Sequence, residues 1–156
     1  MRRKVKGYSF APMSRDDLPR ILEIERQSFS DPWSEKLFLE ELDGDLRRLN
    51  AVVRLDGRVA GYGMGWVVLD EFHLGNLAVD PMLRGKGCGR TLLKHILGEA
   101  HERGCATATL EVRASNAGAI GLYHAFGFRD VAIRRKYYVD EDALVMMAQL
   151  PVETDE

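Results

Sequence analysis

The spacing of hydrophobic and polar residues divides the chain into strand-like and helix-like segments. Alternation predicts a first strand over residues 8–13, and helical spacing of apolar residues predicts two helices, at 17–28 and 34–42. From residue 49 the spacing returns to alternation, which indicates strands. In chain order, the remaining expected elements are strands over residues 51–55, 58–69 and 72–79, a helix after Gly89 that stops at 101–104, a strand over 106–112, a helix from 114 to 126, and strands over 128–138 and 143–150.

Local start and stop signals support these boundaries. Ser14 followed by Asp17 resembles a capping box at the start of the first helix. Asp56-Gly57 is a hairpin-type turn between two strands, and Gly127 is expected to end the last helix. The order of strand, two helices, three strands, helix, strand, helix and two strands predicts an α+β (mixed α/β) fold.

The strand over residues 58–69 has glycine at alternate positions, namely Gly61, Gly63 and Gly65, with Tyr62 and Met64 on the other face. A strip without side chains allows another element to lie close to the sheet. A helix packed on this strip is the favoured interpretation, and a bound ligand is the alternative.

Composition and charge narrow the class of protein. The chain has 156 residues and is 46% hydrophobic, which predicts one domain over residues 1–150 followed by an acidic tail at 151–156. A formal net charge of −2 provides no general basic field for nucleic acid. No signal peptide or bilayer-spanning stretch is evident, so a cytoplasmic location without membrane binding is expected. The two cysteines and four histidines lack metal-ligand spacing, so no metal is expected.

The segment after the strand over 72–79 has the character of a phosphate site. Glycines follow a strand and precede a helix, and the unpaired N–H groups at a helix N-terminus bind anions. Arg84, Lys86 and Arg90 add positive charge. A Walker A loop would need glycine where Arg84 stands and lysine where Arg90 stands, and a dinucleotide fingerprint would need glycine at Arg90. The residues alone therefore indicate the phosphate of some nucleotide.

The spacing Arg84-x-x-Gly87-x-Gly89 resembles the R/Q-x-x-G-x-G/A loop of GNAT-superfamily acetyltransferases. Further segments extend the resemblance from about residue 8 to residue 150 and are similar to ribosomal-protein-alanine N-acetyltransferases of the RimI type. These segments are PWSEK at 32–36, VLDE at 68–71, AVDP at 78–81, LEVRASN at 110–116, Leu122-Tyr123 with Gly127-Phe128, and IRR at 133–135 with Tyr137-Tyr138.

The resemblance implies a mixed seven-stranded sheet flanked by about four helices. Its central parallel strands, here ending near Val79 and Val112, would splay apart around acetyl-CoA. It also implies that Glu111 is the general base, that Tyr123 is the general acid, and that the amine attacks the thioester directly. The implied cofactor-binding residues are Leu77, Ala78, Val79, Arg84, Gly85, Lys86, Gly87, Cys88, Gly89, Arg90 and Asn116. The implied acceptor-binding residues are Pro32, Trp33, Tyr137 and Tyr138.

Each catalytic assignment has a structural alternative. Glu111 could serve only as an ion-pair partner of Arg113, close to it in the sequence, or of Arg84. Tyr123 could be a core residue whose hydroxyl is hydrogen-bonded. Glu71 and His73, on the strand that leads to the cofactor, could share or replace the base.

Three further features qualify the acceptor and cofactor assignments. Cys88 lacks an evident histidine partner and is expected to be a spacer in the phosphate loop. Asn116 could be a helix N-cap. The turn over residues 139–142 is shorter than in RimI-type enzymes, which implies a more open acceptor groove.

The resulting functional hypothesis is an N-terminal acetyltransferase that acts on the alanine α-amine of a small-subunit ribosomal protein. An α-amine, with a reference pKa of about 7.7–8.0, loses its proton more readily than a lysine near 10.4. The alternatives are a lysine or small-molecule amine acetyltransferase on the same scaffold, and a non-catalytic acetyl-CoA-binding module.

Overall fold

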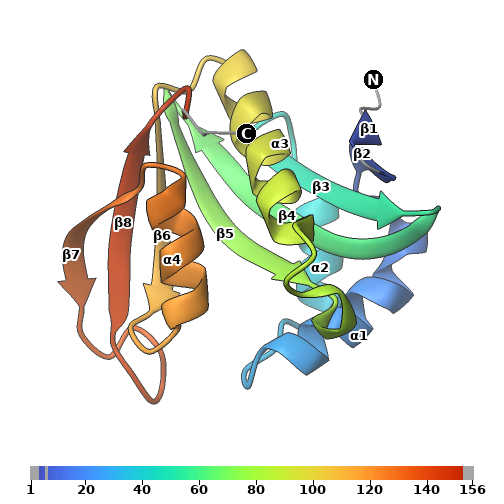
Figure 1. Ribbon diagram of the computed structural model, residues 1–156, viewed down its shortest axis with the longest axis horizontal. Helices are drawn as coiled ribbons and strands as arrows, with labels where there is room; N and C mark the ends of the chain where they lie inside the picture. Colours follow the sequence, from blue (N-terminus) through green and yellow to red (C-terminus); the bar gives the residue numbers. More distant parts are fainter. Residues whose placement is uncertain (1–3, 6, 153–156) are drawn as a thin grey trace. The chain divides into compact units, whose positions relative to one another are not determined.

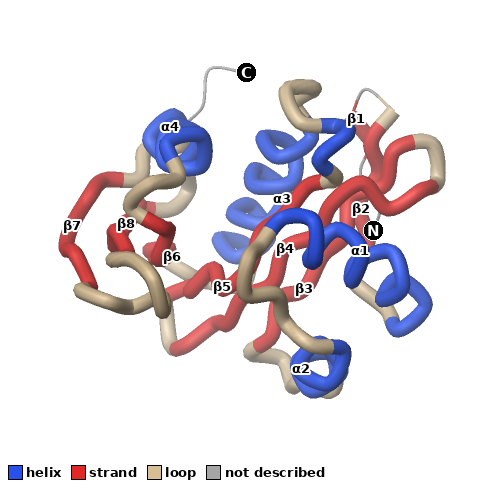
Figure 2. Tube along the Cα trace, turned by 90° about the horizontal axis from the view of Figure 1, so that it is seen from below, coloured by secondary structure: helices blue, strands red, loops and turns tan. Residues whose placement is uncertain are grey.

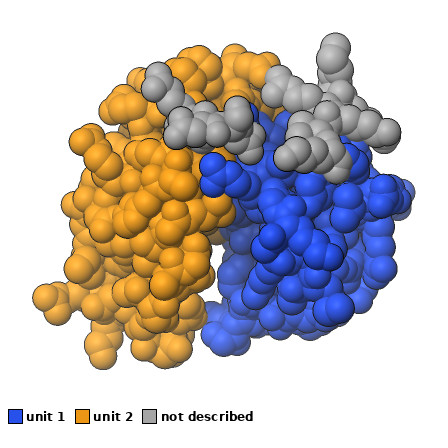
Figure 3. Space-filling model, viewed as in Figure 1, with its two compact units in different colours: residues 1–66, 76–96 blue, residues 67–75, 97–156 orange. Residues whose placement is uncertain are grey.

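The computed structural model describes residues 4–5 and 7–152, so residues 153–156 of the expected acidic tail lie outside the described part. The chain forms two compact units, residues 1–66 with 76–96 and residues 67–75 with 97–156 (Figure 3). Strand β5 (Glu71–Val79) and helix α3 (Cys88–Glu102) each contribute residues to both units (Figure 1). The single domain over residues 1–150 stays a prediction.

Antiparallel strands form the framework of the first unit. Strands β1 (Lys4–Val5), β2 (Tyr8–Pro12), β3 (Arg48–Leu55) and β4 (Arg58–Val68) pair in that order. Its helical segments are η1 (Arg15–Asp17), α1 (Leu18–Ser28), α2 (Glu35–Leu42), η2 (Pro81–Leu83) and the first part of α3. The two predicted N-terminal helices are therefore confirmed, the first with a 3-10 turn ahead of it.

Helices cover both faces of β4 in this unit (Figure 2). Tyr62 and Met64 face a core built with Ile21, Ile24 and Phe38 from α1 and α2. The opposite, glycine-bearing face accepts α3. The favoured interpretation of the glycine strip, a packed helix, is confirmed at Gly63, where an added Cβ would lie 2.2 Å from Cδ1 of Ile96.

The second unit contains a mixed sheet. The first part of β5 pairs in parallel with β6 (Thr107–Arg113), and the register runs from Glu71 with Thr107 to Leu74 with Leu110. Strand β8 (Ala143–Gln149) pairs antiparallel with both β6 and β7 (Arg129–Arg134). Helix α4 (Ala117–Ala125) lies against these strands (Figures 1 and 2). The seven predicted strands are present, and the two-residue β1 adds to them.

One strand boundary was predicted wrongly. The strand expected over residues 128–138 ends at Arg134, so residues 135–142 form a loop longer than the expected four-residue turn. Lys136 has φ +53°, which is incompatible with a continued strand. The Lys136 N–H instead donates to the Asp142 carboxylate at 2.8 Å, and the Tyr138 N–H donates to the Glu141 carbonyl at 3.1 Å. These bonds replace the pairing that a strand would have made.

Within residues 4–5 and 7–152, none of the helices combines the length and apolar character needed to cross a bilayer.

Candidate active site

The predicted phosphate loop lies in the first unit, between η2 and α3. Gly85 and Gly87 have φ +80° and +82°, the left-handed conformation that glycine adopts most readily. The Tyr8 hydroxyl donates to the Lys86 carbonyl at 3.0 Å, and the Arg84 guanidinium donates to Oγ of Ser28 at 3.4 Å. Both side-chain cations, Arg84 and Lys86, are exposed. The loop is thus fastened through its backbone and presents positive charge to solvent.

Asp80 joins the end of β5 to this loop. Its carboxylate accepts the Met82 N–H at 2.9 Å and pairs with the guanidinium of Arg20 from α1. The Asp80 N–H donates to the Ala60 carbonyl of β4 at 2.8 Å. One buried carboxylate therefore links the start of the loop to α1, while its backbone holds the loop to the sheet.

Cys88 is the first residue of α3 and is 1% exposed. Burial, and next the charge of Asp80, raise the pKa of its thiol to about 11. Only the thiolate is a good nucleophile, and this environment keeps the thiol protonated at neutral pH. The interpretation of Cys88 as a spacer agrees with this environment.

In the second unit, Glu111 is placed as the alternation in β6 predicted. Ala108, Leu110 and Val112 are buried on one face, and Glu111 points to the other. Oε1 of Glu111 lies 2.7 Å from Nε2 of His73, whose strand β5 is the parallel neighbour of β6. The structure therefore brings Glu111 together with one of the two residues considered as an assisting base, whereas the other, Glu71, lies exposed at the start of β5.

The ion pair considered between Glu111 and Arg113 is absent from the contacts of the described residues. Arg113 instead binds the carboxylates of Asp140 and Glu141 at 2.5 and 3.2 Å. The cation near Glu111 is Arg134 of β7, 3.7 Å from Oε2.

Tyr123 lies on α4, 7% exposed, with its ring centroid 5.7 Å from that of Phe128. Burial, and next the neighbouring Tyr138, raise the pKa of Tyr123, so its phenol is protonated at neutral pH and able to donate. The alternative of a packed core residue fits the same ring contacts, because core packing and a donor role are compatible in one tyrosine.

The predicted acceptor residues of the last hairpin form an aromatic and cationic cluster. The rings of Tyr137 and Tyr138 meet edge to face at 5.0 Å, and the guanidinium of Arg113 lies 4.4 Å from the centre of the Tyr138 ring. The Tyr138 hydroxyl donates to the Glu111 carbonyl at 3.4 Å. Burial, and next Tyr137, raise the pKa of Tyr138 to about 12. Tyr138 therefore contacts the strand that carries the predicted base, while Tyr137 stays exposed.

The other predicted acceptor residues, Pro32 and Trp33, lie in the first unit. Pro32 is exposed, whereas the Trp33 ring packs on Phe38 with centroids 5.3 Å apart. The Trp33 N–H donates to Oε2 of Glu25 at 2.9 Å. Sequence reasoning missed Glu25, although a signal existed: it follows Leu18 by seven residues and Ile21 by four, on the apolar stripe of α1.

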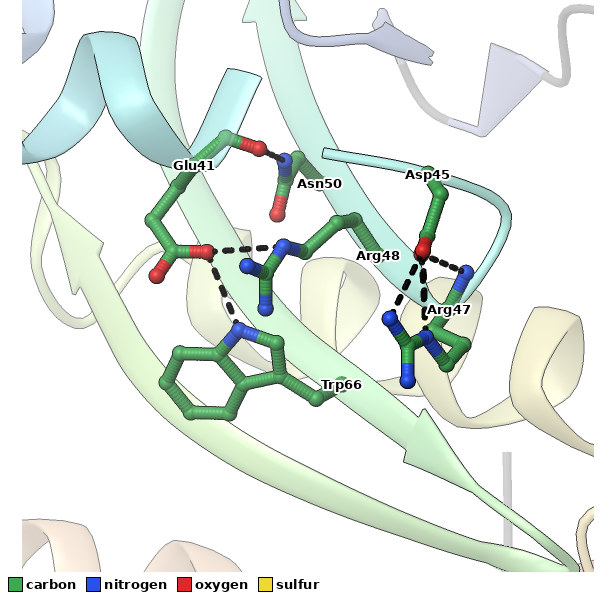
Figure 4. Close-up of polar contacts among 6 residues, drawn as sticks. All are labelled: Glu41, Asp45, Arg47, Arg48, Asn50 and Trp66. Carbon is green, nitrogen blue, oxygen red and sulfur yellow. Dashed lines mark hydrogen bonds and ion pairs between the residues drawn. The ribbon is translucent and has the colours of Figure 1, made fainter. Parts of the chain in front are cut away.

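A second set of contacts that the sequence did not predict involves Glu41, near the end of α2 (Figure 4). Oε2 of Glu41 accepts the Trp66 indole N–H at 3.0 Å and lies 3.1 Å from Nε of Arg48. The Glu41 carbonyl accepts the Asn50 amide at 3.2 Å. These contacts tie α2 to β3 and β4.

Asn116 is the N-cap of α4, and its side chain accepts the Ala119 N–H at 3.1 Å. The capping alternative is thus observed. Across the described part of the chain, no cluster of three or more histidine, cysteine, aspartate or glutamate side chains could hold a metal ion.

The family described as "Acetyltransferase (GNAT) family" matches residues 18–128, which include the whole glycine loop, Glu111 and Tyr123. This chain belongs to the GNAT acetyltransferase family.

Relatives of this GNAT chain agree with the assignment. The [ribosomal protein bS18]-alanine N-acetyltransferase of Salmonella typhimurium (strain LT2) is 46% identical over 138 residues, covering 86% of this chain and 92% of the relative. The crystal structure of the ribosomal-protein-S18-alanine N-acetyltransferase from Escherichia coli is similar with a TM-score of 0.85 and 40% identity, over 96% of this chain and 97% of that one.

A more distant GNAT structure, from Elizabethkingia anophelis with acetyl-CoA bound, has a TM-score of 0.77 and 17% identity over 94% of this chain and 100% of that one. It shares the fold. The predicted fold class is confirmed, and this GNAT protein is an acetyltransferase.

Proposed function

We propose that this acetyltransferase transfers the acetyl group of acetyl-CoA to the α-amine of a ribosomal protein that begins with alanine. The observation that carries the proposal is the 46% identity over 138 residues with an enzyme of that named activity. The match covers 86% of this chain and 92% of that enzyme. The acceptor would be the N-terminus of a protein of the small ribosomal subunit. The reaction would take place in the cytoplasm.

The glycine loop and the start of α3 would hold the diphosphate of acetyl-CoA. Left-handed Gly85 and Gly87 bring the backbone to the surface, and the first N–H groups of α3 supply donors to phosphate oxygens. The exposed side chains of Arg84 and Lys86 add positive charge. The full proposed set is Leu77, Ala78, Val79, Arg84, Gly85, Lys86, Gly87, Cys88, Gly89, Arg90 and Asn116.

Glu111 would act as the general base. Its carboxylate takes the proton that the acceptor α-ammonium must lose before the nitrogen attacks the thioester carbonyl. His73, 2.7 Å away, orients the carboxylate and can share the proton. Tyr123 would donate a hydrogen bond or proton to the sulfur as the carbon–sulfur bond breaks. The new amide bond forms directly, so no acyl-enzyme is required.

The proposed peptide-binding residues are Pro32, Trp33, Tyr137 and Tyr138. Tyr138 is anchored to β6 through the Glu111 carbonyl, which places an aromatic side chain beside the proposed base. The loop over 135–142 is longer than the sequence predicted, so the expectation of a more open groove no longer rests on a short turn.

The test is an acetylation assay by mass spectrometry with two peptides that begin with alanine, one with a free α-amine and one blocked. Only the free peptide should be acetylated. Glu111→Gln should lower the rate by about 10²–10⁴, whereas Glu40→Gln, at an exposed position on α2, should not change it. Equal acetylation of the blocked peptide would contradict the proposed acceptor, and an unchanged rate in Glu111→Gln would contradict the proposed base.

A further inference from the structure

Glu25 is a carboxylate in the core of the first unit. It lies in the last turn of α1 and is 1% exposed, although most glutamates lie at the surface. A buried carboxylate is costly unless hydrogen-bond donors surround it. Its retention inside an otherwise apolar stripe therefore calls for a role that an apolar residue would not perform.

Three donors from three other segments converge on the two oxygens of Glu25. Oε1 accepts the hydroxyl of Tyr62 from β4 and the amide of Asn76 from β5, the latter at 3.0 Å. Oε2 accepts the backbone N–H of Trp33 at 2.9 Å. Burial, and next the charge of Glu25, raise the pKa of Tyr62, so its hydroxyl keeps the proton that it donates.

Aromatic contacts close the arrangement into a ring. The Trp33 indole packs on Phe38 at 5.3 Å, and Phe38 meets Tyr62 edge to face at 5.9 Å. Tyr62 then donates back to Glu25. The segment between α1 and α2 is therefore held at two points, through its backbone by Glu25 and through its indole by Phe38.

We propose that Glu25 is a positioning residue that fixes the Pro32–Trp33 segment and thereby sets the affinity for the acceptor peptide. This inference rests on the proposed function, in which that segment contacts the peptide. Through Asn76, the same carboxylate holds the residue directly before Leu77, where the proposed cofactor strand begins. Glu25 thus ties the acceptor segment and the cofactor strand to one point inside the first unit.

Glu25→Gln separates this role from packing, because glutamine has the same shape but only one acceptor oxygen. Two donors meet Oε1 and one meets Oε2, so the glutamine oxygen is best placed toward Tyr62 and Asn76. Its NH₂ group then faces the Trp33 N–H, and two donors oppose each other. Tyr62→Phe is the matched control, because it removes a donor from the other oxygen and leaves the Trp33 contact in place.

Two measurements decide the inference. Hydrogen exchange of the Trp33 amide should be on the order of tenfold faster in Glu25→Gln and unchanged in Tyr62→Phe, since a hydrogen bond to a charged group is the stronger kind. The KM for the acceptor peptide should rise by a similar factor in Glu25→Gln, with kcat and the KM for acetyl-CoA unchanged. If Glu25→Gln does not fold, Glu25→Asp, which withdraws the carboxylate by one methylene, should show the same two changes.

Equal protection of the Trp33 amide in the wild type and Glu25→Gln would overturn the inference. So would a fall in kcat without a change in acceptor KM, or an equal rise in acceptor KM in Tyr62→Phe, because both indicate a general loss of structure. If the wild type acetylates no N-terminal peptide, the proposed function fails, while the exchange measurement still decides whether Glu25 holds the segment.

Discussion

Gly63 on β4 offers a quantitative test of how α3 packs in the first unit. An added Cβ would lie 2.2 Å from Cδ1 of Ile96 and 3.1 Å from Cδ1 of Leu77, both inside normal contact distance. Ile96 is fully buried, so its side chain has little room to move away. Gly63→Ala should therefore destabilise the protein even though alanine is intrinsically better than glycine in a strand.

The magnitude follows from two opposing effects. Overpacking a filled core costs about 1–3 kcal/mol, and replacing glycine within a strand returns about 0.5–1 kcal/mol. The midpoints of these ranges give a fall in the free energy of unfolding of roughly 1 kcal/mol, with an upper limit of about 2.5 kcal/mol. A fall of 1 kcal/mol lowers the Tm of a chain of this size by about 2–4 °C. Gly98→Ala in α3 should instead raise the stability, because no atom of the described residues outside the local helix backbone lies within 4 Å of the added Cβ.

Ile96→Val removes the atom that the new methyl group would meet. In the wild type this truncation should cost about 0.5–1.5 kcal/mol, but beside Gly63→Ala it should cost nothing or restore stability. Urea unfolding of the four proteins, followed by circular dichroism, measures the coupling, expected to be about 1–2 kcal/mol. Additive effects within about 0.5 kcal/mol would refute the close approach of Ile96 to β4.

Three further outcomes are expected. Asn116→Ala should lower the free energy of unfolding by about 0.5–2 kcal/mol, because the N-cap of α4 is lost. Asn116→Asp should keep the cap. Thermal unfolding of the two variants measures both effects. Hydrogen bonding by Arg113 lowers the pKa of Asp140 below its usual value of 3.8. The contact between the two side chains should therefore persist above pH 3.8 and be lost only as the pH falls through the pKa of Asp140 in the folded protein. An NMR titration of the loop over residues 135–142 with a midpoint at or above pH 3.8 would contradict this expectation. Cys88, with its pKa raised to about 11, should resist iodoacetamide in the folded protein and react after unfolding; rapid alkylation of the native protein would show an accessible thiolate.

The sequence predicted correctly those elements that depend on residues close together along the chain. Ser34 caps α2 by accepting the Leu37 N–H at 3.2 Å, and the alternation in β6 separates Glu111 from the buried Leu110 and Val112. The strand predicted over residues 128–138 ends early, at Arg134, for a reason that the alternation does not contain. Alternation does not encode the left-handed conformation of Lys136. Around it, the Lys136 N–H donates to the Asp142 carboxylate and the Tyr138 N–H donates to the Glu141 carbonyl.

The order of elements, the family resemblance and the face on which Glu111 lies could thus be predicted from the amino-acid sequence, because periodicity and motif spacing involve neighbours along the chain. The partners that these residues contact become known from the folded chain. His73 reaches Glu111 across 38 positions and Tyr62 reaches Glu25 across 37, and such contacts depend on strand register and helix packing rather than on spacing. For the same reason the glycine strip predicted a close approach to β4, while the identity of Ile96 as the approaching residue required the packed structure.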